Sequence, residues 1–255
     1  MLFILFFIQK IINFFLFILI KLRIKSNYQN SFNIIDFDYI IKNEIGYFHI
    51  RNNTDDEYIV SSLFENDLDS YFKLDNGIFL DIGTHIGKYS IKIAKQNNNN
   101  FVYSFEANKT TYKSLLINII KNDLSNIKAI NKGISDKKGT ISFLESKKDT
   151  GISRIVSTNK DDIKGDITII ETISIDEFIL ENSIDLNLIK LIKIDVEGHE
   201  LNVLNGMKNL LLENKVLKII CEITNNEKEI LEYMGGVYYH GEKIKEGYYL
   251  FQYKN

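Results

Sequence analysis

The apolar and polar positions of the chain change their rhythm after the turn signal Asn76-Gly77. From there on, short apolar runs alternate with longer segments whose apolar residues recur at helical spacing. The pattern predicts strands over 78–81, 101–105, 127–131, 189–194 and 216–223. It predicts helices over 86–95, 110–122, 175–181 and 199–212. Such alternation is typical of an α/β fold whose doubly wound sheet is mostly parallel.

The remaining segments follow other patterns. Residues 139–173 lack the alternation and indicate extra strands or an active-site loop. Residues 235–253 contain Gly-Gly and two Tyr-Tyr pairs and alternate, which favours an antiparallel hairpin at the C-terminal edge of the sheet. Upstream of the turn, we expect a short strand over 45–50 and a helix over 55–73.

The N-terminal segment is the most apolar part of the chain. Residues 1–20 are almost wholly apolar, and three basic residues follow by position 25. The run is long enough to span a bilayer, but Lys10 near its middle is costly there, so an interfacial helix is the alternative. A signal peptide is disfavoured because a basic start and a small-residue cleavage site are missing. We therefore predict a hydrophobic helix that associates with a membrane through residues 1–25, the following basic residues placing the folded domain on the cytoplasmic side.

Length and composition set the class of protein. The chain has 255 residues, of which 45% are hydrophobic and 25% charged, as in ordinary globular proteins. The predicted parts are a membrane-associating segment over 1–25, a connector with a helical region over 26–75, and one α/β domain over 76–255. A net charge of -3 predicts no nucleic-acid partner. The single cysteine, Cys221, forms no internal disulfide and fits a reducing compartment.

The first chemical signal follows the first strand of the α/β pattern. The strand leads into Asp81, Gly83 and Gly87 and then a helix, so the backbone there can turn tightly and approach a ligand. The dinucleotide fingerprint requires glycine where Asp81 stands. A carboxylate suits a ligand with a cationic ammonium group better than a pyrophosphate. The alternative is a strand-to-helix turn that binds nothing.

A second signal is an acid at the end of the next strand. Glu106 comes about twenty residues after Gly83, where a carboxylate can accept hydrogen bonds from both hydroxyls of a ribose. The alternative is a solvated acid that favours the dipole of the following helix.

A third signal is the acidic segment Asp195-Val196-Glu197-Gly198-His199-Glu200 directly after an apolar strand. The carboxyl end of such a strand lies at the ligand crevice of an open α/β sheet, and Glu222 ends the next strand at the same edge. Converging carboxylates and a histidine bind a divalent metal, position a hydroxyl substrate or act as general base. The alternative is that Glu197 and Glu200 only cap the next helix.

Six motifs in this order resemble the FkbM-type methyltransferases. They are Phe79-Leu80-Asp81-Ile82-Gly83 with Gly87-Lys88-Tyr89-Ser90, Ser104-Phe105-Glu106, Gly133-Ile134-Ser135-Asp136, Ser174-Ile175-Asp176-Glu177-Phe178, Lys193-Ile194-Asp195-Val196-Glu197-Gly198 and Cys221-Glu222. The resemblance implies a class I methyltransferase fold that binds S-adenosylmethionine. It also implies O-methylation of a hydroxyl on a sugar, polyketide or lipid-linked acceptor.

The resemblance also assigns roles to residues. It implies that the loop with Asp81, Gly83, Thr84 and Gly87 holds the methionine side of the cofactor and that Glu106 holds the ribose. Further along the chain, it implies that Ile134, Ser135 or Asp136 lies near the adenine and that Asp195, Glu197 and His199 face the acceptor. The chain departs from the family at Ala107, where proline is usual.

The expected reaction needs an aligned hydroxyl and a group that takes its proton. We expect Asp195 or Glu197 in that role, with His199 as a weaker candidate; a divalent metal is a further possibility. An inactive, membrane-tethered binding protein with the same fold is the alternative function, against which the intact Asp81, Glu106 and Asp195 argue. A nicotinamide-dependent oxidoreductase is disfavoured because G-x-G-x-x-G is missing.

Overall fold

The computed structural model describes residues 37–146, 154–155 and 166–254. Residues 37–255 belong to one compact unit by their internal contacts. The expected N-terminal hydrophobic helix over residues 1–25 lies outside the described residues.

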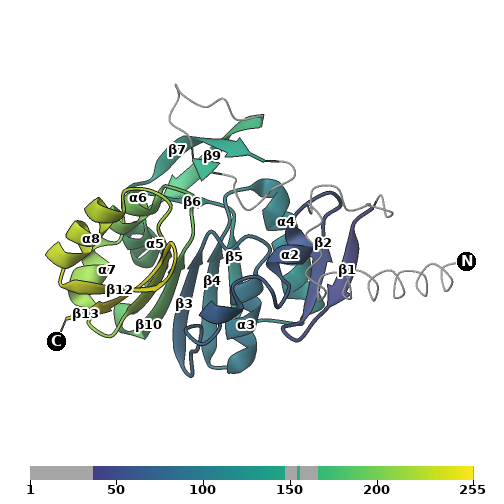
Figure 1. The fold of residues 1–255 in the computed structure, drawn as a ribbon, viewed down its shortest axis with the longest axis horizontal. Helices are drawn as coiled ribbons and strands as arrows, with labels where there is room; N and C mark the ends of the chain where they lie inside the picture. The colour runs from purple at the N-terminus through teal and green to yellow at the C-terminus, as the bar shows by residue number, and fades with distance from the viewer. Residues whose placement is uncertain (1–36, 147–153, 156–165, 255) are drawn as a thin grey trace, which may run out of the picture. The chain divides into compact units, whose positions relative to one another are not determined.

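A seven-stranded sheet forms the centre of this unit, in the order β12-β13-β11-β10-β3-β4-β5 (Figure 1). The parallel strands are β3 (Gly77–Ile82), β4 (Asn100–Phe105), β5 (Ile127–Ile130), β10 (Ile189–Ile194) and β11 (Lys218–Glu222). The C-terminal hairpin consists of β12 (Tyr239–Lys245) and β13 (Tyr248–Tyr253), and β13 pairs antiparallel with β11. The predicted mostly parallel α/β sheet with an antiparallel C-terminal edge is therefore confirmed.

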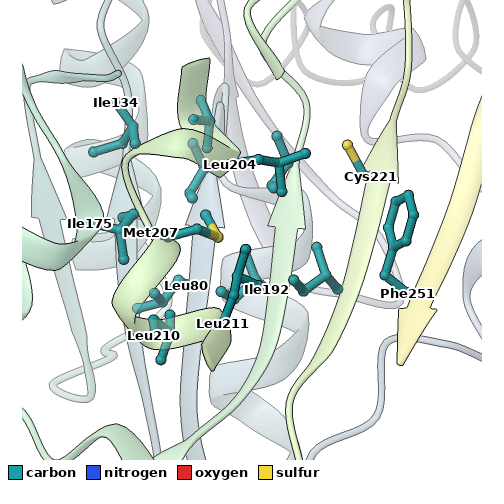
Figure 2. Close-up of a cluster of buried hydrophobic side chains, with 14 of the residues drawn as sticks. Leu80, Ile134, Ile175, Ile192, Leu204, Met207, Leu210, Leu211, Cys221 and Phe251 are labelled. Atoms are coloured by element: carbon teal, nitrogen blue, oxygen red, sulfur yellow. The ribbon is translucent and has the colours of Figure 1, made fainter. Parts of the chain in front are cut away.

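One face of the sheet carries the larger apolar core. It packs against α5 (Ile175–Glu181), α6 (Glu200–Asn205), α7 (Lys208–Glu213) and α8 (Glu227–Gly236). Because side chains alternate along a strand, Leu80 and Ile192 both point to this face, and both are fully buried there. Figure 2 shows them beside Leu204 and Met207, with Cys221 at the edge of the same cluster.

The opposite face is covered by α3 (Lys88–Gln96) and differs in polarity along the strands. Phe79 and Leu191 pack with Tyr89 in a second apolar cluster. Two positions further along β3 and β10, Asp81 and Lys193 stand directly opposite each other in the sheet register and are both buried. This face therefore changes from apolar to polar as its strands approach their carboxyl ends.

The predicted helix over 199–212 is divided into α6 and α7. The carbonyl of Gly206 accepts a hydrogen bond from the backbone N–H of Asp176. The Asp176 carboxylate in turn accepts the backbone N–H groups of Asn209 and Leu210, at the start of α7. The start of α5 thus interrupts the helix and satisfies the amide groups that the break exposes.

The predicted helix over 55–73 is wrong. The structure has only α2 (Asp56–Ile59) and a short 3-10 helix, η2 (Asn66–Leu68). Between them, Glu65 has a left-handed backbone with φ of 54°. Lys88 donates hydrogen bonds to the carbonyls of Ser61 and Phe64, carbonyls that a continuous helix would use itself.

The connector upstream contains a hairpin of β1 (Tyr39–Lys42) and β2 (Tyr47–Ile50), where only one strand was expected. It packs on α4 (Lys109–Lys121) through Asn118, whose side-chain oxygen accepts the His49 N–H at 2.6 Å. The Asn118 amide donates to the carbonyl of Ile86 at 2.8 Å. One buried asparagine therefore joins the hairpin, α4 and the loop after β3.

A second sheet, in the order β6-β9-β7-β8, takes three of its strands from the segment 139–173 and β6 from just before it. Its strands are β6 (Gly133–Ile134), β7 (Gly139–Glu145), β8 (Arg154–Ile155) and β9 (Asp166–Ile173). The expectation of extra strands there is confirmed. The predicted hairpin over 235–253 begins later than expected, because α8 extends to Gly236 and buries Ile230 and Met234 against the sheet.

Among the residues that the structure describes, none of the helices combines the length and the apolar character that crossing a bilayer requires. This finding contradicts the prediction of a membrane-associated protein with its domain facing the cytoplasm. Residues 1–25, on which that prediction was based, lie outside the described part of the chain.

We expect Leu80→Ala to lower the free energy of unfolding by about 2–5 kcal/mol, because it removes a fully buried side chain from the centre of the larger core. Leu180→Ala on α5 is the control, since that leucine is 80% exposed. Urea denaturation of both variants measures the difference. Equal midpoints for the two variants would contradict this account of the core.

Candidate functional site

The carboxyl ends of β3, β4, β10 and β11 border a cavity of about 490 Å³. From these strand ends it is lined by Gly83, Glu106, Asp195, Glu197 and Glu222. The second sheet contributes Ile134, Phe143 and Ile155, and the segment 55–65 contributes six residues that close another side. Its size and its mixture of apolar walls with a few polar groups are typical of a cofactor or substrate pocket.

The loop after β3 is fastened to the ends of both neighbouring strands. The N–H groups of Gly83 and Thr84 donate to the Phe105 carbonyl at 3.0 and 3.1 Å. Gly83 has φ of 77°, and a Cβ atom on it would lie 1.7 Å from the Asp195 carbonyl oxygen. Gly87 has φ of 92° at the N-cap of α3. Both predicted glycines are therefore required by the backbone itself, and Gly83 also lines the cavity.

Asp81, near the end of β3, and Thr84, within the loop, do not line the cavity. One Asp81 carboxylate oxygen, Oδ2, accepts hydrogen bonds from Thr84 at 2.8 Å and Ser90 at 2.6 Å. The other, Oδ1, is buried without a hydrogen-bond partner in the structure. Burial raises the pKa of the Asp81 carboxyl, and the nearby Lys193 ammonium opposes that shift. Asp81 thus holds the loop through Oδ2, and its Oδ1 can still accept a hydrogen bond.

Glu106 lines the cavity from the end of β4, as predicted. Its two carboxylate oxygens accept the backbone N–H groups of His85 at 2.9 Å and Asn108 at 2.8 Å. Burial raises its pKa to about 7, although both of these hydrogen bonds favour the charged form. Each oxygen has a second lone pair, so this anchored carboxylate still fits a pair of ligand hydroxyls.

Ser135, Asp136 and His199 form a separate polar group. The Ser135 hydroxyl lies 2.9 Å from His199 Nε2 and donates to the Asp136 carboxylate at 3.0 Å. Burial lowers the pKa of His199. Their neighbours Gly133 and Ile134 line the cavity, and these three residues do not. Their predicted roles toward adenine and acceptor stay predictions.

Asp195, Glu197 and Glu222 come together as an acid cluster in the cavity, with one oxygen of each within 4.8 Å of the others. Burial and then the charge of Asp195 raise the pKa of Glu197 to about 7. The same two causes raise the pKa of Glu222, whose carboxyl shares a hydrogen bond with Asp195. Glu222 is therefore the proton-bearing member of the cluster at neutral pH.

The backbone after Asp195 directs these acids. Glu197 and Gly198 are both left-handed, with φ of 54° and 102°. A non-glycine residue in this region costs on the order of 1 kcal/mol, so the turn is maintained by its surroundings. Glu200 Oε1 accepts the Gly198 N–H at 2.7 Å and so fixes the turn before α6, while the N-cap of that helix, His199, makes no side-chain capping hydrogen bond.

The sequence pattern missed residues that the segment 55–65 and β13 bring to the cavity. Glu65 is buried and accepts hydrogen bonds from the hydroxyls of Tyr89 and Tyr248. His85, in the loop after β3, is 3.7 Å from the buried Asp56 carboxylate. No motif spacing points to these contacts, because their partners are far apart in the sequence.

Comparison with known proteins identifies the family. The model of the methyltransferase FkbM domain matches residues 81–244, which is more than half of the chain. This chain belongs to the FkbM methyltransferase family. The match includes Asp81, Glu106 and the acid cluster, so the predicted family is confirmed.

Individual relatives are more distant. The hexuronic acid methyltransferase AglP of Haloferax volcanii is 33% identical over 149 residues, which cover 58% of this chain and 56% of that protein. Among solved structures, a precorrin-6y C5,15-methyltransferase from Geobacter metallireducens has a TM-score of 0.46 at 11% identity, over 74% of this chain and 86% of that one. A SAM-dependent methyltransferase from Agrobacterium tumefaciens has a TM-score of 0.44 at 13% identity, over 85% and 70%.

The raised pKa values predict how stability depends on pH. Glu106 and Glu197 titrate near pH 7 in the folded chain, well above the usual value of a glutamate. Between the two values the folded state binds more protons than the unfolded state, so the free energy of unfolding falls as pH rises from about 4.5 to about 7.

Glu106→Gln should flatten this fall, because the variant removes one of the titrating groups. Glu213→Gln is the control, since Glu213 is exposed on α7. Urea denaturation across this pH range measures the slope. A Glu106→Gln variant with the same slope as the wild type would contradict the raised pKa of Glu106.

Proposed function

We propose that this chain transfers a methyl group from S-adenosylmethionine to a hydroxyl of a sugar. The observation that carries the proposal is the single cavity bordered by the glycine loop, Glu106 and the acid cluster. It brings the features expected of a cofactor site and of an acceptor site to neighbouring strand ends. Family membership supports the methyltransferase activity.

The cofactor part of the cavity fits S-adenosylmethionine by its donors and acceptors. Glu106 offers a buried carboxylate to the ribose hydroxyls, and Ile134 and Phe143 offer apolar surface to a purine ring. Asp81 does not line the cavity and supports this part of the site by holding the loop through Thr84 and Ser90. When bound, S-adenosylmethionine supplies an electrophilic methyl carbon.

The acceptor chemistry requires a proton acceptor. As a hydroxyl oxygen forms its bond to the methyl carbon, the carbon–sulfur bond breaks and the hydroxyl proton must leave. We propose that Asp195 accepts this proton. Its carboxylate lies in the cavity and accepts a hydrogen bond from the Lys193 ammonium at 2.7 Å. Glu197 is the second choice, because its raised pKa leaves it partly protonated near pH 7.

A sugar is favoured as acceptor for two reasons. The relative from Haloferax volcanii is described as acting on a hexuronic acid. The cavity also has an excess of carboxylates, which are good acceptors for the several hydroxyl donors of a sugar ring.

We expect Glu106→Gln to weaken S-adenosylmethionine binding at least about tenfold, since it replaces a charged acceptor of the ribose hydroxyls by an amide. Isothermal titration calorimetry with S-adenosylmethionine and S-adenosylhomocysteine measures this. Glu213→Gln should bind like the wild type. A wild-type chain that binds neither compound would refute the proposed cofactor.

We expect Asp195→Asn to keep cofactor binding but lose about 10²–10⁴-fold in turnover, the usual contribution of a general base. The assay supplies a labelled methyl donor with nucleotide-linked hexuronic acids and neutral hexoses, and mass spectrometry locates the added methyl on the product. Normal turnover by this variant would refute the role of Asp195. A wild-type chain that binds the cofactor but methylates none of these acceptors would refute the proposed acceptor class.

A further inference from the structure

Lys193 is a buried lysine at the next-to-last position of β10, two residues before Asp195 of the acid cluster. It is 4% exposed, and its ammonium donates to Asp195 Oδ2 at 2.7 Å. Its ammonium also lies 5.6 Å from the centre of the Tyr89 ring. Burial alone would lower the pKa of a lysine, but here the charges of Asp195, Asp81 and Glu65 raise it, so the side chain remains a cation.

The register of the sheet explains why this cation lies where it does. Lys193 and Asp81 occupy opposing positions on β10 and β3, on the face that turns polar near the strand ends. The ammonium is therefore placed between the Asp81 carboxylate and the acid cluster. A buried ammonium is tolerated only with such partners.

The contacts of the acid cluster show whether its carboxyl groups suit a divalent metal. Three carboxylates at this spacing match a metal's preference for oxygen ligands. However, one Asp195 oxygen is already bonded to the Lys193 ammonium, and Glu222 retains its own proton. A divalent ion would have to displace both the Lys193 ammonium and the Glu222 proton. These three carboxyl groups, with the partners they have, therefore do not fit a divalent ion.

We propose that Lys193 is a positioning residue that serves as the resident cation of the acid cluster, in place of a divalent metal. The inference builds on the proposed function, in which Asp195 receives the acceptor proton. The ammonium fixes the orientation of the Asp195 carboxylate through its hydrogen bond to Oδ2. Together with the hydrogen bond from Glu222, this contact holds the Asp195 carboxylate in place at the cavity.

The first experiment measures Mn²⁺ binding to the full chain by the electron paramagnetic resonance signal of free Mn²⁺. We expect the wild type to leave this signal unchanged at millimolar Mn²⁺. Lys193→Met should lower it by creating a site among the freed carboxylates, and adding Asp195→Asn should abolish the new site. Lys193→Arg and the control Lys190→Met, on the same strand, should behave like the wild type.

The second experiment compares melting temperatures at about pH 8 and about pH 5. Lys193→Met should be destabilised at the higher pH, and the gap should narrow at the lower pH, because protonation removes the uncompensated negative charge. Lys193→Arg should restore the wild-type profile. The charged and titratable groups that face the ammonium are Asp81, Asp195, Glu65, Glu197, Glu222, Lys88 and Tyr89.

Two results would overturn the proposal. One is Mn²⁺ uptake by the wild type that Asp195→Asn abolishes, which would make the cluster a metal site. The other is a folded Lys193→Met that takes up no Mn²⁺ and melts with the wild-type pH profile. If Lys193→Met fails to fold, recovery by Lys193→Arg supports the proposal and failure of both overturns it. Calorimetry with S-adenosylmethionine on the same samples tests the proposed function separately, since Mn²⁺ binding does not depend on it.

Discussion

The junction between the ends of β3 and β10 is the constraint on which the rest of the site depends. The Asp195 N–H donates to the Ile82 carbonyl at 3.0 Å, and Gly83 packs so closely on the Asp195 carbonyl that no side chain fits between them. The Phe105 carbonyl receives both N–H groups at the start of the loop. Three strand ends are thereby held at one level, so the glycine loop, Glu106 and the acid cluster open onto the same cavity.

The two faces of the sheet have different roles. One stabilises the fold, and the other carries buried charged residues next to the candidate site. One face is apolar along its whole length, and its burial under four helices supplies much of the driving force for folding. The other face exchanges apolar for charged residues toward the carboxyl ends, at Asp81 and Lys193. Charges buried there are costly, and they are offset by hydrogen bonds and by one another. The polar end of this face is where a cofactor and an acceptor are expected to meet.

The segment 55–65 lines one side of the cavity at this polar edge of the sheet. Glu65 and Phe64 line the cavity; Glu65 accepts hydrogen bonds from two tyrosine hydroxyls, and the Phe64 carbonyl accepts one from Lys88. Removing water from the carboxylates is the first cause of the raised pKa values of Glu106 and Glu197. Exclusion of water also strengthens each electrostatic interaction inside the cavity.

The sequence by itself determined the parallel sheet, its strand ends and the residues placed at them, because hydrophobic period and glycine position are local properties. Gly83, Glu106 and Asp195 could be found in this way, and the family with them. Only the tertiary structure decided that Lys193 faces Asp81, that Glu65 and Tyr248 close the cavity, and that His199 turns to Ser135. These contacts join residues distant in the chain, and their energies depend on burial. The helix expected over 55–73 failed for the same reason, since Lys88 takes the carbonyls that the helix would have used.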